Sequence, residues 1–175
     1  MDLTLKRTPG LFLVGFMASG KSTVGPVLAA QLGWRFSDLD IEIEAEQQTT
    51  IARIFAAGGE AAFRALETEA IRRKIRQIQA GHPYVIALGG GAFLQPNNWE
   101  LVKNNGITIW LDCSLERINR RLVGNTTRPL AADPARVAQL LEHRNPFYAR
   151  ADHRVDADSD DVEQVTRRIL DLPIF

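Results

Sequence analysis

The stretch that decides the fold is GFMASGKS, residues 15–22, which Thr23 follows. It satisfies the phosphate-binding loop pattern, in which glycines let the backbone curl so that successive N–H groups face one anion. Apolar residues 11–14 before it predict a buried strand, and residues 21–32 after it predict a helix. The start of that helix directs its positive end at the same anion. This context predicts a nucleotide phosphate site in which Lys21 reaches the terminal phosphates and the Ser22 hydroxyl ligates Mg²⁺.

Strand and helix signals alternate along the rest of the chain. Short apolar runs predict strands at residues 34–36, 84–88, 107–111 and 153–157. Helices are expected at residues 41–47, 63–78, 115–122, 137–144 and 162–170, with Pro146 interrupting the fourth of these and Pro26 locally distorting the helix at residues 21–32. The alternation predicts an α/β fold in one domain over residues 1–175, with a parallel sheet covered on both faces. Ligands of such sheets bind outside the carboxyl ends of the strands, so the loops after residues 14, 36, 88 and 111 are expected to share one crevice.

The composition excludes several classes of protein. The chain has 175 residues, with 21 Lys+Arg against 21 Asp+Glu, and this balance disfavours a nucleic-acid binder. No apolar run is long enough to cross a bilayer, and the N-terminus has no apolar signal core, so a cytoplasmic protein is expected. Cys113 is the only cysteine, which excludes an intramolecular disulfide or a multi-cysteine metal site. The histidines, at positions 82, 143 and 153, lack metal-ligand spacing.

Asp38 and Asp40 stand two residues apart after the predicted strand at residues 34–36. In an extended chain their side chains share one side. One carboxylate is then able to hold a metal through water while the other accepts a proton from a substrate hydroxyl. Helix capping is the alternative, because Asp is favoured before a helix such as the one expected at residues 41–47. Beside a phosphate loop, we favour the functional interpretation.

Asp112 follows the predicted strand at residues 107–111 and has two interpretations. It is either a second metal carboxylate or part of a capping turn with Ser114, and we favour the capping turn. The chain contains no Asn-Lys-x-Asp element for guanine recognition, which disfavours a GTPase.

Three further groups have both a structural and a functional interpretation. Arg64 and Glu67 lie three apart on one helix face, either as an exposed ion pair or as part of a site. Gly89-Gly90-Gly91 is either an ordinary loop or a place where a ligand touches the backbone directly. Arg128 lies in the aperiodic segment at residues 124–133, where a solvated arginine is the default expectation.

Five sequence elements together resemble the shikimate kinases. They are GFMASGKST at residues 15–23, Asp38-Leu39-Asp40, GEAAFRALE at residues 59–67, the glycine triplet, and the pair formed by RPL at residues 128–130 with RNPFY at residues 144–148. Many kinases share the phosphate loop. The GEAAFRALE stretch, the glycine triplet, and the arginines of RPL and RNPFY are much more specific to this family. The resemblance runs from the phosphate loop to the C-terminus.

The resemblance implies a nucleoside-monophosphate-kinase-like fold, with a five-stranded parallel sheet in three α/β/α layers. It implies transfer of the γ-phosphate of ATP to the 3-hydroxyl of shikimate, a step toward chorismate and the aromatic amino acids. A substrate-binding region at about residues 38–67, a lid at about residues 124–134 and a monomeric state are also expected. The alternatives are a related small-molecule kinase, such as one for gluconate, and a nucleotide-binding module without catalysis.

The resemblance also implies roles for individual residues of this chain. ATP is bound by Ala18, Ser19, Gly20, Lys21, Ser22 and Thr23, with Arg121 flanking the adenine and Arg128 closing over ATP from the lid. Ser22 binds Mg²⁺, and Asp38 helps through water. Shikimate is bound by Asp40, Arg64, Gly89, Gly90, Gly91 and Arg144, while Glu67 holds Arg64 in position. The catalytic residues are Lys21, Asp40 and Arg128.

Overall fold

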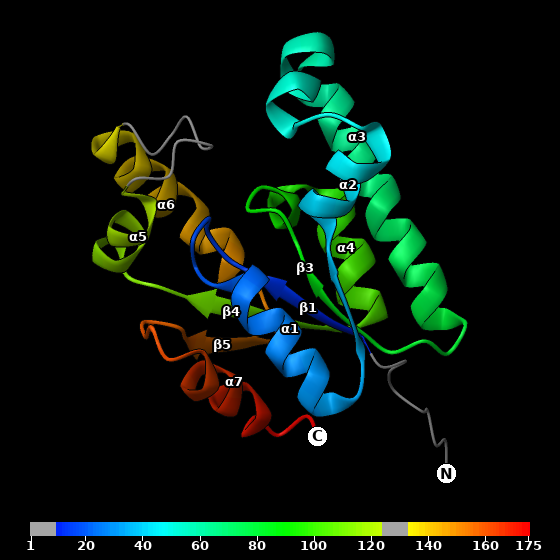
Figure 1. The fold of residues 1–175 in the computed structure, drawn as a ribbon, viewed down its shortest axis with the longest axis vertical. Helices are drawn as coiled ribbons and strands as arrows, with labels where there is room; N and C mark the ends of the chain where they lie inside the picture. Colours follow the sequence, from blue (N-terminus) through cyan, green and yellow to red (C-terminus); the bar gives the residue numbers. More distant parts are fainter. Residues whose placement is uncertain (1–9, 124–132) are drawn as a thin grey trace.

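The centre of the molecule is a five-stranded parallel sheet (Figure 1). The computed structural model describes residues 10–123 and 133–175. Within them the strand order is β2-β3-β1-β4-β5, so the first strand lies in the middle. The strands are β1 Gly10–Val14, β2 Arg35–Asp38, β3 Tyr84–Ala87, β4 Ile107–Asp112 and β5 His153–Asp156. The predicted parallel sheet is therefore confirmed.

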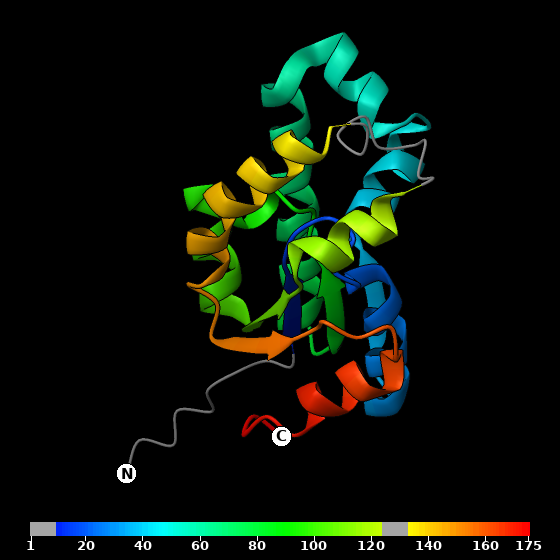
Figure 2. The ribbon, with the colours of Figure 1, turned by 90° about the vertical axis from the view of Figure 1, so that its left-hand side faces the viewer.

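Helices cover both faces of the sheet (Figure 2). One face carries α1 (Lys21–Leu32) and α7 (Val162–Leu170). The other carries α3 (Ile51–Gln79), the 3-10 turn η1 (Ala92–Leu94), α4 (Pro96–Asn105), α5 (Leu115–Leu122) and α6 (Pro134–Tyr148), while α2 (Leu39–Gln47) packs against α3. Alternate residues of β1 divide between the two cores, because successive side chains of a strand point to opposite faces. Leu11 and Leu13 pack with α1 and α7, whereas Phe12 and Val14 pack with α3 to α6. The three-layer architecture is thus confirmed.

Two local predictions were wrong, and one helix was not predicted. The second helix begins at Leu39, so Asp40 lies in its first turn and not in an extended chain beside Asp38. Pro146 does not interrupt α6, which continues to the fully buried Tyr148. Helix α4 was not predicted, because its sequence PNNWELVKNN is mostly polar. By contrast, α1 is one helix although Pro26 lies inside it.

Helix α3 begins twelve residues before the predicted start and contains a kink at Gly59. The backbone of Gly59 has φ 74° and ψ −177°, a conformation that is nearly restricted to glycine. The short segment before the kink follows α2 directly, and the Ile51 amide donates to the Glu44 carboxylate at 2.9 Å. In Figure 1 this segment lies above the sheet, next to α2.

The parallel strands bring the predicted site loops to one edge of the sheet. The phosphate loop follows β1, α2 follows β2, and the glycine triplet follows β3. Within residues 10–123 and 133–175, no helix is both long and apolar enough to cross a membrane.

Candidate active site

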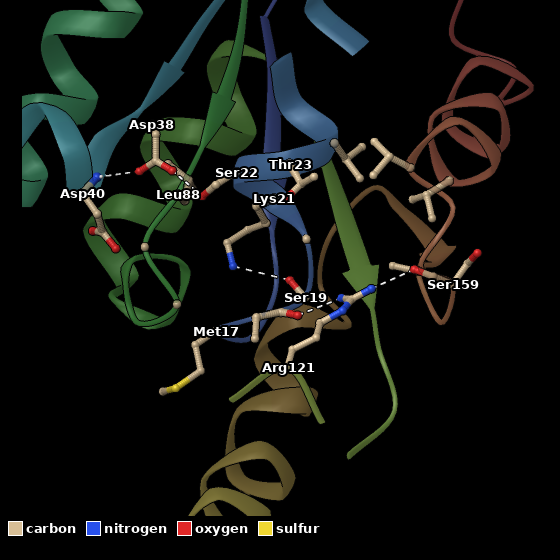
Figure 3. Close-up of a pocket in the computed structure, with 18 of the residues that line it drawn as sticks. Met17, Ser19, Lys21, Ser22, Thr23, Asp38, Asp40, Leu88, Arg121 and Ser159 are labelled. Carbon is tan, nitrogen blue, oxygen red and sulfur yellow. Dashed lines mark hydrogen bonds between the residues drawn. The ribbon is translucent and has the colours of Figure 1, made fainter. Parts of the chain in front are cut away.

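A cleft of about 350 Å³ opens at the carboxyl ends of the strands (Figure 3). Residues from the phosphate loop, α2, the glycine triplet, α5 and the loop before α7 form its walls. Of the predicted site residues, the cleft is lined by Ala18, Ser19, Gly20, Lys21, Ser22, Thr23, Asp38, Asp40, Gly89, Gly90 and Arg121. The expected crevice is therefore present for the loops after residues 14, 36 and 88, whereas the loop directly after residue 111 does not line it.

The phosphate loop holds Lys21 at its centre. The ammonium donates to the carbonyl oxygens of Gly15 and Phe16, each at 2.8 Å, and to Ser19 Oγ at 3.4 Å. Gly15 is required at this point, because its φ is 145° and an added Cβ would lie 2.8 Å from the Leu111 carbonyl oxygen. Lys21 is only 9% exposed, so a fixed cation faces the space that the loop encloses. This is the electrostatic environment that a polyphosphate needs.

Asp38 unites the two interpretations that the sequence left open. Its Oδ1 caps α2 by accepting from the amides of Asp40 at 3.1 Å and Ile41 at 3.3 Å. Its Oδ2 accepts from the Ser22 hydroxyl at 2.5 Å. The cap thus aims the second oxygen at the phosphate loop, as Figure 3 shows. A hydroxyl and a carboxylate side by side are the hard oxygen donors that suit Mg²⁺.

The glycine triplet lies among four charged side chains. A Cβ built on Gly89 would lie 2.7 Å from Asp40 Oδ1 and 3.1 Å from Glu67 Oε1. A Cβ on Gly90 would lie 3.1 Å from an Arg144 nitrogen, and one on Gly91 would lie 2.6 Å from Arg64 Nη2. The three glycines therefore bring Asp40, Glu67, Arg64 and Arg144 around one short stretch of backbone, although these two arginines and Glu67 do not line the cleft itself.

Arg64 and Glu67 form an ion pair on one face of α3, as predicted. Arg64 Nη1 donates to Glu67 Oε2 at 2.9 Å, and Arg64 also contacts the exposed Glu60 at 3.3 Å. Glu67 is only 1% exposed. Burial raises the pKa of Glu67 to about 7, the negative Asp40 adds to this rise, and Arg64 and Arg144 oppose it. A simple solvated ion pair does not have these properties.

Helix α6 supplies Arg144 and one residue that sequence reasoning missed. The Arg144 guanidinium carbon lies 5.7 Å from the centre of the Phe16 ring. Tyr148, one turn further along, donates its hydroxyl hydrogen bond to the Gly90 carbonyl. Burial raises the pKa of Tyr148 to about 12, against the opposing charge of Arg144. Tyr148 belongs to the RNPFY stretch, and that motif was the available signal for its role.

Arg121 connects the phosphate loop to the loop before α7. Its guanidinium donates to the Ala18 carbonyl at 2.8 Å and to the Ser159 carbonyl at 2.7 Å. Ser159 and Asp160 line the same end of the cleft, and they belong to the segment near residues 156–161 that the family resemblance associates with the adenine. This end, remote from Asp40 in Figure 3, has a planar cation suited to flank a nucleotide base.

Other residues considered in the sequence analysis lie away from the cleft or outside the described residues. Asp112 pairs with Arg154 and does not line the cavity, so the metal interpretation of Asp112 is not supported. The alternative, a capping turn, is realised by its neighbour Ser114, whose Oγ accepts from the Arg117 amide. Cys113 is buried, and burial raises the pKa of its thiol. Arg128 and most of the expected lid lie outside the described residues.

Comparisons of the sequence with a family model and with curated relatives indicate one family. A family model described as shikimate kinase matches residues 17–172. The shikimate kinase of Synechococcus sp. strain RCC307 is 44% identical over 164 residues, covering 91% of this chain and 82% of that protein. The one from Persephonella marina is 40% identical over 161 residues, covering 91% and 96%.

Several solved structures are also similar to this chain in fold. The shikimate kinase from Acinetobacter baumannii in complex with shikimate has a TM-score of 0.85 and 34% identity, covering 93% of this chain and 90% of that one. A gluconokinase from Sinorhizobium meliloti has a TM-score of 0.59 at 17% identity, covering 94% and 91%. The second likeness concerns the fold alone.

Proposed function

The chain belongs to the shikimate kinase family, and from this premise we propose that its cleft transfers the γ-phosphate of ATP to the 3-hydroxyl of shikimate. The observation that supports this most strongly is the group around the glycine triplet, where Arg64 and Arg144 lie beside Asp40. Two guanidinium groups match one carboxylate, and a carboxylate matches ring hydroxyls. A hydroxylated acid therefore suits the region around the glycine triplet, which adjoins the cleft at Gly89, Gly90 and Asp40.

ATP binds along the phosphate loop. The backbone amides of Ala18, Ser19 and Gly20, with Ser22 and Thr23 at the start of α1, cradle the phosphates. Lys21 leaves its carbonyl partners to contact the terminal phosphates. Arg121 lies beside the base, because it already bridges the two loops at that end.

Ser22 and Asp38 are the residues that would hold Mg²⁺, Ser22 directly and Asp38 through water. When bound, the ion neutralises charge on the phosphates during transfer. The hydrogen bond between the two side chains keeps both donors at the edge of the phosphate loop. Their fit to a hard cation supports this part of the proposal.

At the acceptor end, Arg64 and Arg144 bind the shikimate carboxylate, and the backbone of Gly89, Gly90 and Gly91 closes against the ring. Glu67 positions Arg64 through its 2.9 Å ion pair. Asp40 orients the 3-hydroxyl and accepts its proton as the oxygen attacks the γ-phosphate. Catalysis then consists mainly of positioning and charge stabilisation.

The remaining assignments rest on the family resemblance. Arg128 closes over ATP and stabilises the transferring charge, and the lid at about residues 124–134 excludes water. A single catalytic domain over residues 1–175, a monomer and a cytoplasmic location belong to the same proposal.

A coupled assay of ADP release tests the function. Purified protein with ATP and Mg²⁺ is offered shikimate, gluconate and a panel of other hydroxy acids and sugars. Turnover is expected with shikimate, and it is expected to stop when EDTA removes Mg²⁺ and to return when Mg²⁺ is added back. Turnover with gluconate and none with shikimate would reject the proposal.

A further inference from the structure

Glu67 is buried, and among the described residues only one of its two carboxylate oxygens accepts a hydrogen bond. It is 1% exposed, and its Oε2 accepts from Arg64 at 2.9 Å. Its Oε1 is buried and has no hydrogen-bond partner among residues 10–123 and 133–175. A buried carboxylate is stable as an anion only when its charge is compensated and its oxygens are hydrogen-bonded. The second oxygen of Glu67 therefore lacks the stabilisation that an anion needs.

The charged groups around Glu67 come from three helices. Arg64 on α3 pairs with it, Asp40 on α2 adds a negative charge, and Arg144 on α6 adds a positive one. The glycine triplet contributes only backbone. Glu67 Oε1 and Asp40 Oδ1 both lie within about 3 Å of the same point, the position of a Cβ on Gly89. Among the described residues, Arg64 and Arg144 thus lie near the carboxylates of Glu67 and Asp40 before any ligand arrives.

A substrate carboxylate changes this arrangement. It adds a further negative charge beside Glu67, and it draws on the guanidinium of Arg64, the only group that donates to Glu67 among the described residues. We propose that Glu67 takes up a proton when the substrate carboxylate docks on Arg64 and Arg144. This inference rests on the proposed function, because it needs an acidic substrate at that position.

The proton balance of the step is simple. A buffer acid gives one proton to Glu67 and becomes its conjugate base, and the Glu67 carboxylate becomes a neutral carboxylic acid. The uptake offsets the negative charge that the substrate carboxylate brings to the site. The pKa of about 7 in the absence of substrate places the exchange near neutrality. Substrate affinity is then expected to fall as pH rises, by up to about tenfold in total if binding raises the pKa by about one unit.

Isothermal titration calorimetry tests the uptake. Shikimate is titrated into the protein without nucleotide at pH 7.5, in buffers of low and high ionisation enthalpy. If binding raises the pKa by about one unit, the dependence of heat on buffer corresponds to an uptake of about 0.5 proton per site. Glu67→Gln is expected to bind shikimate without buffer dependence. Glu60→Gln is the matched control, because Glu60 also contacts Arg64 but is 67% exposed, and it is expected to retain the uptake.

The outcomes separate the two proposals. If shikimate does not bind the wild-type protein and also supports no ADP release in the coupled assay, the proposed function fails. If it binds with no buffer dependence, or if Glu67→Gln retains the uptake, only the proton inference is overturned. Should Glu67→Gln fail to fold, the affinity of the wild-type protein for shikimate between pH 6.5 and 8.5 decides, and a constant affinity overturns the inference.

Discussion

The guanidinium of Arg64 occupies the space that a side chain on residue 91 would need. A Cβ built on Gly91 would lie 2.6 Å from Nη2 and 2.9 Å from Nη1 of Arg64. The backbone of Gly91 has φ −99°, which any residue adopts without strain. Glycine is therefore needed here for the position of Arg64, and not for the conformation of the loop.

Gly91→Ala is expected to preserve the fold and to displace Arg64, since the clash involves the flexible end of a side chain. The loss of a charged hydrogen bond corresponds to a rise of about 10- to 100-fold in the KM for shikimate. The KM for ATP, measured in the same steady-state experiment, is the internal control. An unchanged KM for shikimate would contradict the role of Arg64 in carboxylate binding.

Arg64→Ala is expected to weaken shikimate binding by about 30-fold or more, because it removes one partner of a buried charge pair. ATP binding is expected to change little. Calorimetry with each ligand separately measures both. Arg72→Ala is the matched control, because Arg72 is exposed on the same helix. Equal losses for the two ligands would indicate general damage to the fold.

Asp40→Asn is expected to lower kcat by about 10²- to 10⁴-fold, since an amide does not accept the hydroxyl proton. Nucleotide affinity is expected to be retained, because Asp40 contacts Asp38 through its backbone amide, which the substitution keeps. Single-turnover kinetics and nucleotide titration together measure these effects. A kcat close to the wild-type value would remove Asp40 from the chemistry.

Tyr148→Phe removes the hydrogen bond to the Gly90 carbonyl and is expected to cost about 1 kcal/mol of stability. In a chain of this length, that corresponds to a fall of about 2–4 °C in Tm. The other tyrosine is the matched control: Tyr84 is buried against Lys74, and Tyr84→Phe is expected to have the smaller effect on Tm. Equal shifts for both variants would argue against a specific role of the Tyr148 hydroxyl.

The buried Glu67 makes stability depend on pH. Because its pKa in the folded protein is about 7 and its ordinary value is 4.5, the folded state binds more protons than the unfolded state between these values. The stability that this carboxyl contributes is present below about pH 4.5 and is lost as pH rises through about 7.

Urea denaturation at pH 5 and pH 8 measures this effect. The unfolding free energy of the wild-type protein is expected to fall relative to that of Glu67→Gln by on the order of 2 kcal/mol between the two pH values. Glu60→Gln serves as the control and is expected to follow the wild-type protein. A constant difference between wild type and Glu67→Gln would show that Glu67 titrates normally.

The sequence predicted the sheet, the phosphate loop and most helices, because these depend on local apolar spacing and on glycine. It failed where tertiary contacts override local signals. Pro146 stays within α6 because the following turn buries Tyr148 completely. Helix α4 has little apolar spacing, yet it packs through the buried Val102.

The site shows the same division. Spacing along α3 was sufficient to pair Arg64 with Glu67. Whether Asp38 caps a helix or faces the phosphate loop could not be decided from the sequence, because each oxygen of one carboxylate performs one of these roles.

The kink at Gly59 divides α3 into parts with different freedom to change during evolution. The segment after Gly59 is anchored in the core through Ile71 and Ile78, and it carries Arg64 and Glu67. Residues 51–58 precede the kink, so replacements among them leave the helical register of that charged pair intact. The segment before the kink can therefore change in sequence while the pair of Arg64 and Glu67 keeps its geometry. A residue with a Cβ at position 59 would rarely adopt this backbone conformation. Its presence would therefore disfavour the kink that separates the two segments of α3.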